Sequence, residues 1–521
     1  MNAGWWQAGA AGLILSVILA QLALGVDVLV LALSVTSMVI GLYPITRVGF
    51  DLYTIFAALF WFRYTGGVLF AKTLYLQPLD YLLKEPVQSY ALSTLLVGVV
   101  VAIVLLARRW DKGTSVFMSM PSTRHARQVG FVAYVIGTGA GVVVGLIIRR
   151  DSDANTGLFF VVPFALISLT FLGYAAEILH TVTQSGGRRL VSGRLACMLA
   201  FTIAVALFLN VRALAVNSII CVFLCGLLFR AIKPRHLALG AILGFVFTSY
   251  VSPLALELRI IKEDKSAVQF ASDVVELVVR TATESGLVAE LQRKEAYRSR
   301  FESGTAQYDY FGDGSNILNR MAFVALLDSV YAQTQVLNPI GTRALTEQVV
   351  PRNAPGFLVD KEARTYGYGD WLSWEIGLIE TGRVAYLSFP IPVEGIAVFG
   401  PFLGVTLWPV VLMLPMFLIL SKISSFRTAS ATSLFLLSAF HWELIEAPSD
   451  GYLGLLTRTL PITVLPAWVL FWLWANKDQF TESGRPGTPR LGAGLRHRGA
   501  LPGGRATGKS GRSGASSLPS S

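Results

Sequence analysis

Residues 338–370 read NPIGTRALTEQVVPRNAPGFLVDKEARTYGYGD and lie in the one long polar segment of an otherwise apolar chain. This segment runs from Glu257 to Arg383 and contains 18 of the 32 acidic residues together with 14 basic ones. Runs of Leu, Val, Ala, Phe and Gly flank it on both sides. We therefore expect a scaffold of apolar helices that holds one polar segment against a membrane surface.

The composition is typical of a membrane protein. Of the 521 residues, 54% are hydrophobic and 14% are charged, whereas about 25% of the residues in a soluble domain are charged. A helix needs about 20 apolar residues to cross a bilayer, and many windows of the chain provide them. The sequence predicts an all-α polytopic membrane protein with about 12 transmembrane helices and one long external, periplasmic loop domain that contains helices.

The apolar runs divide the chain into four parts. The predicted spans are residues 6–25, 27–44, 51–71, 90–108, 129–149, 156–180, 195–211, 213–231, 236–256, 393–421, 429–447 and 459–476. The predicted domains are an N-terminal bundle of about nine helices (1–256), the external segment (257–383), about three C-terminal helices (384–478) and a disordered, basic cytoplasmic tail (479–521).

Loop charges indicate the orientation of the chain. The net charge of +11 comes from the tail and from short loops, with basic clusters at 108–127, 188–194, 230–235 and 422–427. Lys and Arg in short loops favour the cytoplasmic side, and these four loops alternate correctly for it. Both termini are then cytoplasmic, and residues 257–383 are outside. Because topology accounts for the basic excess, we expect no nucleic acid partner.

One predicted helix in the polar segment carries two candidate site residues. Ser315 or Asn316 is a suitable N-cap for a helix that ends near Thr334. Arg320 and Asp328 are eight residues apart, which places them about 80° apart around such a helix. Both side chains can therefore face one cleft, although each is equally compatible with an exposed, unpaired position.

The loop that follows is rich in cations. Arg343, Arg352, Lys361 and Arg364 fall within 22 residues that also contain Pro and Gly. Such a loop can direct backbone N–H groups and guanidinium groups toward one point. The planar guanidinium suits phosphate oxygens because it binds them with two hydrogen bonds. The alternative for each arginine is that it bonds carbonyl groups of its own loop.

Two further acidic residues are candidates for chemistry. Asp370 precedes Trp371 and Trp374, and aromatic rings beside a carboxylate suit sugar binding, although tryptophan at a membrane interface is the rival interpretation. Glu394 lies near the outer edge of the next predicted span. An ionisable group at that depth is a functional hypothesis by default, unless it lies in water.

The remaining polar residues of the spans do not predict a metal site. Arg63 lies midway along the third span, where a charge is costly unless it is paired or faces a cavity. His441 and Glu443 lack the i, i+4 spacing and the second His of a zinc protease. The three cysteines all lie in apolar spans without a neighbouring His or Asp, so packing explains them better than metal binding.

The order of motifs late in the chain resembles the bacterial O-antigen and exopolysaccharide repeat-unit polymerase family. The likeness covers residues 315–405 and consists of Asn319-Arg320-Met-Ala-Phe323, Asp328, Pro351-Arg352, Lys361, Gly369-Asp370, Glu394 and Phe399-Gly400-Pro-Phe-Leu-Gly404. Outside this range the chain agrees with the family only in consisting of apolar helices. The resemblance implies a multi-pass protein of the bacterial inner membrane.

The resemblance also implies an activity. A metal-independent glycosyltransferase of this kind joins repeat units carried on undecaprenyl diphosphate, and it needs no cofactor. Arg320, Arg343, Arg352 and Lys361 would neutralise the departing diphosphate, and Asp370, Asp328 or Glu394 would accept the proton of the attacking sugar hydroxyl. An apolar cavity among the spans would hold the prenyl tail. The implied partners are the lipid-linked oligosaccharide, membrane lipid and other export or chain-length proteins.

Three other functions remain open on the sequence. A ligase that moves finished polymer to an acceptor shares both the architecture and the lipid diphosphate donor. A transporter or flippase for the same lipid-linked sugars would use charged, water-lined spans and an internal repeat, and neither is evident. A non-catalytic scaffold would use the external segment as a docking surface, and its arginines would be individually replaceable.

Overall fold

The computed structural model describes residues 3–117, 125–150, 158–209, 212–229, 267–284, 322–354, 366–384 and 387–476, together with short pieces between 254 and 319. Every element described below belongs to one compact unit, Met1–Ala475. The predicted tail, 479–521, lies outside the described residues. Within the described ranges, all regular secondary structure is helical, which agrees with the predicted all-α class.

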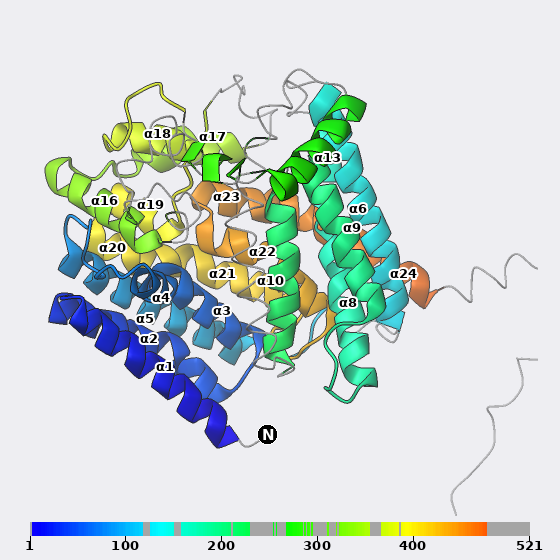
Figure 1. The fold of residues 1–521 in the computed structure, drawn as a ribbon, viewed down its shortest axis with the longest axis horizontal. Coiled ribbons are helices and arrows are strands. Elements are labelled where there is room, and N and C mark those ends of the chain that lie inside the picture. Colours follow the sequence, from blue (N-terminus) through cyan, green and yellow to red (C-terminus); the bar gives the residue numbers. More distant parts are fainter. Residues whose placement is uncertain are drawn as a thin grey trace, which may run out of the picture. The chain divides into compact units, whose positions relative to one another are not determined.

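The helices follow one another with short connections (Figure 1). The first part contains α1 (Ala3–Ala23), α2 (Val28–Val48), α3 (Leu52–Trp61), η1 (Phe62–Gly66), α4 (Gly67–Leu74), α5 (Pro86–Trp110), α6 (Ala126–Arg150), α7 (Leu158–Leu166), α8 (Leu169–Gln184), α9 (Gly193–Leu209) and α10 (Arg212–Leu228). The polar segment contains α13 (Ala267–Thr283), α16 (Phe323–Val336), η6 (Leu345–Val349), α17 (Val350–Asn353) and α18 (Tyr368–Glu375). The last part contains α19 (Ile391–Phe399), α20 (Pro401–Val405), α21 (Leu407–Ile423), α22 (Ala431–Glu446), α23 (Ser449–Gly454), η7 (Leu455–Thr459) and α24 (Leu460–Ala475).

Seven of the described helices are long and apolar enough to cross a membrane. They are Val28–Val48, Leu52–Leu74, Pro86–Trp110, Ala126–Val144, Val162–Gln184, Pro401–Ile423 and Ser449–Ala475. Gly12–Ala23, Gly193–Ala206 and Leu214–Leu228 are apolar but shorter. Nearly all of the predicted span 236–256 lies outside the described residues. The chain is therefore a helical membrane protein, and the count of twelve spans and the orientation stay predictions.

Three of the helical segments are π-helices, η1, η6 and η7. Each is continuous with an α-helix on at least one side, because the residues at both of its ends keep right-handed helical φ and ψ angles. A π-turn inserts one residue into the helical repeat and is frequent at functional sites. All three segments carry polar or charged side chains, so the backbone irregularity coincides with polar positions.

The polar segment packs on the apolar helices and is not a separate body. Helix α16 contacts α5, α19 and η1, and α17 contacts α23; Figure 1 shows α16, α17 and α18 gathered beside α19 and α23. The Asn338–Gly341 turn closes the C-terminal end of α19, since the backbone N–H groups of Ile340 and Gly341 donate to carbonyls of Ala397 and Val398 at 3.0 and 2.9 Å. These bonds satisfy carbonyl groups that a helix end leaves without partners.

A buried lysine makes a second connection between the polar segment and the bundle. Lys72 on α4 is fully buried and donates to the carbonyl of Tyr310, to Gln77 at 3.0 Å and to the carbonyl of Tyr81 at 3.2 Å. Its ammonium group also lies 3.9 Å from the centre of the Tyr310 ring. A buried ammonium group is tolerated only with such partners, so Lys72 holds residue 310 against α4.

The predicted helix from Ser315 to Thr334 is wrong at its start. Helix α16 begins at Phe323, because Ala322 has φ −100° and ψ 71°, which no α-helix accommodates. The helix extends to Val336 at its other end. The proposed caps, Ser315 and Asn316, lie outside the described residues. Phe323 and Val324 instead enter the core directly, and their burial sets the helix start.

Candidate functional site

A fully buried carboxylate lies where the polar segment meets the C-terminal helices. Glu394 is in the first turn of α19 and has no exposed surface. Its Oε1 accepts a hydrogen bond from the Tyr368 hydroxyl at 2.8 Å, and its Oε2 accepts one from the backbone N–H of Ser449 at 2.7 Å. The Ser449 hydroxyl also donates to Oε1. Three elements, α18, α19 and α23, therefore meet at one acidic group.

The bond between Tyr368 and Glu394 has a defined direction. Burial, and then the nearby Glu394 charge, raise the pKa of the Tyr368 hydroxyl well above its ordinary value. The phenol therefore stays protonated and donates to the carboxylate. Burying a charge is expensive unless hydrogen bonds compensate, and the three donors supply that compensation while leaving Glu394 in reach of a proton on a neighbouring hydroxyl.

Asp370, the second predicted carboxylate, joins two stretches of backbone. It is fully buried in α18, and its oxygens accept the N–H groups of Gly367 at 3.1 Å and Leu387 at 3.4 Å. The neighbouring Gly369 lies directly against the carbonyl of Leu387, with no room for a side chain. Asp370 therefore orders the turn before α18, and it lies two residues from Tyr368, the donor to Glu394.

Asp328, the third predicted carboxylate, organises the beginning of α5. It is 2% exposed and accepts the backbone N–H groups of Lys84 and Glu85 and the hydroxyl of Ser89, each at 2.8 Å. All three donors belong to the turn before α5 or to its first helical residues, where N–H groups lack intrahelical partners. The geometry gives Asp328 a positional role between α16 and α5.

Replacing Asp328 by Ala should lower the free energy of unfolding by about 3 kcal/mol, because the buried donors of Lys84, Glu85 and Ser89 would lose their acceptor. Asp328→Asn keeps one acceptor oxygen and should lose roughly half as much. The midpoint of thermal unfolding in detergent measures the loss. The folded fraction of Asp328→Asn should keep its activity; an inactive but fully stable variant would instead assign chemistry to this carboxylate.

Two of the four predicted cations are in the described part of the chain. Arg352 on α17 donates to the Gln348 side chain and to the carbonyl of Tyr366 at 3.3 Å, and its guanidinium lies 5.6 Å from the centre of the Tyr366 ring. Arg343 is exposed and pairs with Glu347 at 2.9 Å and Glu375 at 3.7 Å. The other two, Arg320 and Lys361, lie outside the described residues.

Arg352 extends the Glu394 cluster toward α23. It lies within electrostatic range of Asp450, which directly follows the Ser449 that binds Glu394. Arg458, on η7, donates to the backbone carbonyl of Arg352 at 2.7 Å. We call Tyr368, Glu394, Ser449, Asp450, Arg352 and Arg458 the α19–α23 cluster. It brings acidic and basic groups together from four separate elements.

Sequence reasoning missed the contribution of α23 to this cluster. Ser449 and Asp450 belong to the sequence Ala447-Pro448-Ser449-Asp450-Gly451, a turn signal within the last apolar region of the chain. A turn of this composition between two apolar helices is the signal that was available. The partner of Glu394 lies 55 residues further along the chain, and spacing alone does not predict such a pairing.

A second buried polar group lies on η1 and α22. Arg63 forms an ion pair with Glu446, so the intramembrane charge noted in the sequence is paired. Its guanidinium also lies 4.6 Å from the centre of the Phe323 ring and 5.0 Å from that of Trp442. Among the described residues, no group of three or more His, Cys, Asp or Glu side chains is placed to hold a metal ion.

The chain matches no family model, no curated protein and no solved structure. Its function is therefore argued from the α19–α23 cluster and from the membrane-spanning helices that carry it.

Proposed function

We propose that this protein is a membrane-embedded polymerase that joins lipid-linked oligosaccharide repeat units into a surface polysaccharide, acting at the outer face of the bacterial inner membrane. The observation that carries the proposal is the buried Glu394, held by Tyr368 and Ser449 beside Asp450 and Arg352. Glycosyl transfer from a lipid diphosphate needs a proton acceptor and cations close together at the membrane, and the cluster combines both.

In the proposed reaction, a sugar hydroxyl of the incoming unit attacks the anomeric carbon of the growing chain. The C–O bond from that carbon to the diphosphate breaks, and its electron pair stays on the leaving diphosphate oxygen. Glu394 accepts the hydroxyl proton. Arg352, with Arg458 beside it, balances the charge of the leaving group. The products are a longer lipid-linked chain and a free lipid diphosphate.

The three predicted carboxylates differ in how their oxygens are used. Asp328 and Asp370 accept backbone N–H groups that order turns, whereas Glu394 accepts two hydroxyl groups and one N–H. A hydroxyl can rotate away and leave an oxygen for a substrate hydroxyl, but a backbone N–H at a helix start is fixed. This difference favours Glu394 as the proton acceptor.

Deletion of the gene tests the proposal through the length distribution of lipid-linked glycan. Single repeat units should accumulate outside the inner membrane, and long chains should disappear. Long chains that stay on their lipid carrier would contradict a polymerase and indicate a ligase. Units trapped on the cytoplasmic side would indicate a transporter instead.

Arg352→Ala should lower the rate of polymer formation by about 100-fold, since one charge-balancing donor is typically worth that much in the transition state. Purified protein with lipid-linked repeat units as substrate provides the assay. Arg280→Ala is the matched control, because Arg280 is exposed and forms only an i, i+4 pair with Glu284 among its printed contacts on α13. Equal rates for both variants, at equal protein amounts, would remove Arg352 from the proposed site.

A further inference from the structure

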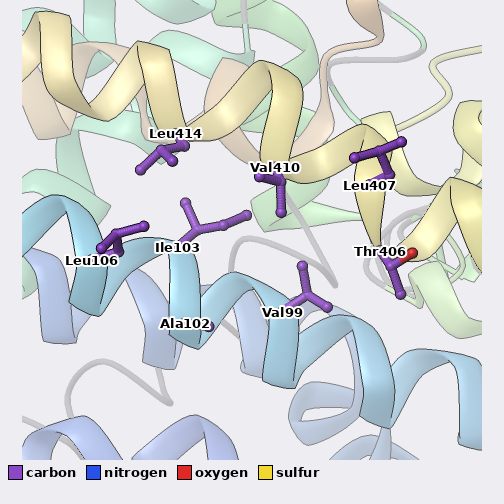
Figure 2. A pocket seen from close by; sticks show the side chains of 8 residues that line it. All are labelled: Val99, Ala102, Ile103, Leu106, Thr406, Leu407, Val410 and Leu414. Atoms are coloured by element: carbon purple, nitrogen blue, oxygen red, sulfur yellow. The ribbon is translucent and has the colours of Figure 1, made fainter.

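An apolar groove runs between two membrane-spanning helices. Its volume is about 400 Å³, and its walls are Val99, Ala102, Ile103 and Leu106 on α5 with Thr406, Leu407, Val410 and Leu414 on α20 and α21. Figure 2 shows these side chains facing each other from helices that run in the same direction. The Thr406 hydroxyl donates to the carbonyl of Phe402 at 2.7 Å. The groove therefore presents an apolar surface along its length.

The dimensions and position of the groove fit one hydrocarbon chain. At 1.5 Å per residue, its walls extend about 10–12 Å along each helix, and a helical segment of that length occupies roughly 900–1,200 Å³. The groove is too small for a helix. Both walls belong to spans of high hydropathy, and Leu407 is 55% exposed at the rim. The groove thus opens toward the hydrocarbon of the bilayer, where a polar ligand would lose its hydrogen bonds.

The groove is continuous with the α19–α23 cluster through a close crossing of two glycines. Gly395 follows Glu394, and it packs so tightly on Gly404 that a Cβ atom on Gly395 would lie 2.6 Å from the Gly404 carbonyl oxygen. Thr406, at one end of the groove, is two residues beyond Gly404. The buried carboxylate and the groove therefore lie on opposite sides of one backbone contact.

We infer that this groove binds the isoprenoid tail of the lipid-linked substrate, with its diphosphate directed toward Glu394 and Arg352. The inference rests on the proposed function for the identity of the lipid. A tail in the groove holds the head group at the depth of α19, and the Gly395–Gly404 contact fixes the groove relative to the acidic group. Positioning of this kind converts membrane diffusion into a defined approach to the site.

A pair of variants on α21 tests the assignment. Val410→Trp fills the groove, whereas Ile419→Trp adds the same side chain at a position that is 39% exposed and does not line it. Full-length protein in lipid nanodiscs is labelled with a polyprenyl diphosphate that carries a diazirine in its tail. Label should map to 99–106 and 406–414, and Val410→Trp should reduce it about tenfold, while Ile419→Trp should not.

Competition separates the substrate from ordinary lipid. Excess unlabelled polyprenyl diphosphate should abolish labelling, and the same excess of phosphatidylglycerol should not. Equal competition by phosphatidylglycerol, or equal labelling of the two variants, would overturn the assignment. Specific labelling in a protein that forms no polymer would contradict the proposed function and leave the groove assignment standing. Polymer formation without labelling of the groove would do the reverse.

Discussion

Glu394→Gln should lower the rate of polymer formation by about 100- to 10,000-fold, which is the range expected when a general base is removed. The amide has nearly the shape of the carboxylate but cannot accept the proton of the attacking hydroxyl. Tyr368→Phe should have a smaller effect, because it removes one donor to Glu394 and keeps the carboxylate. Initial rates with purified protein and lipid-linked repeat units measure both.

The control for Glu394→Gln separates chemistry from folding. Glu284→Gln changes an exposed carboxylate on α13 and should leave the rate unchanged. Thermal unfolding should show that Glu394→Gln remains folded, although its amide meets three donors in a buried site. A folded Glu394→Gln protein with the wild-type rate would exclude this residue as the base and return attention to Asp370.

The fold class follows from the sequence because bilayer thickness sets the length of apolar runs. Helix breaks are harder to predict. The run predicted as one span from 393 to 421 contains a break at Gly400, which has φ +85° and separates α19 from α20. Pro401 after it favours a new helix start. That break places Glu394 on a short helix packed against α20, a geometry that hydropathy does not reveal.

The site was only partly predictable, since residue types appear in the sequence and their partners do not. Asp328, Asp370 and Glu394 were all candidates on type and position, and the structure gives them different neighbours. Asp328 binds the turn before α5, more than 230 residues earlier in the chain. Glu394 binds Ser449. Such long-range contacts depend on how the helices pack, and an isolated motif carries no information about packing.

Arg63→Met should be the most destabilising of the single substitutions considered, with a cost of about 3–5 kcal/mol. The side chains of Arg63 and Glu446 are each 11% exposed, so removing one leaves the other charge buried without its ion-pair partner. The double variant Arg63→Met, Glu446→Gln should be more stable than Arg63→Met alone, because no uncompensated charge remains. Thermal unfolding of the wild type, both single variants and the double variant gives the coupling energy directly.

The exposed pair of Arg280 and Glu284 is the reference for that cycle. Its side chains are 47% and 48% exposed, and water screens the interaction, so its removal should leave the unfolding midpoint unchanged. Arg63 differs because it lies in the π-helical segment η1, where its guanidinium also contacts Phe323 at the start of α16. Additive effects of the Arg63 and Glu446 substitutions would show that the pair does not couple the spans to the polar segment. A strong coupling would make it the contact that holds α16 and α22 in the arrangement the α19–α23 cluster requires.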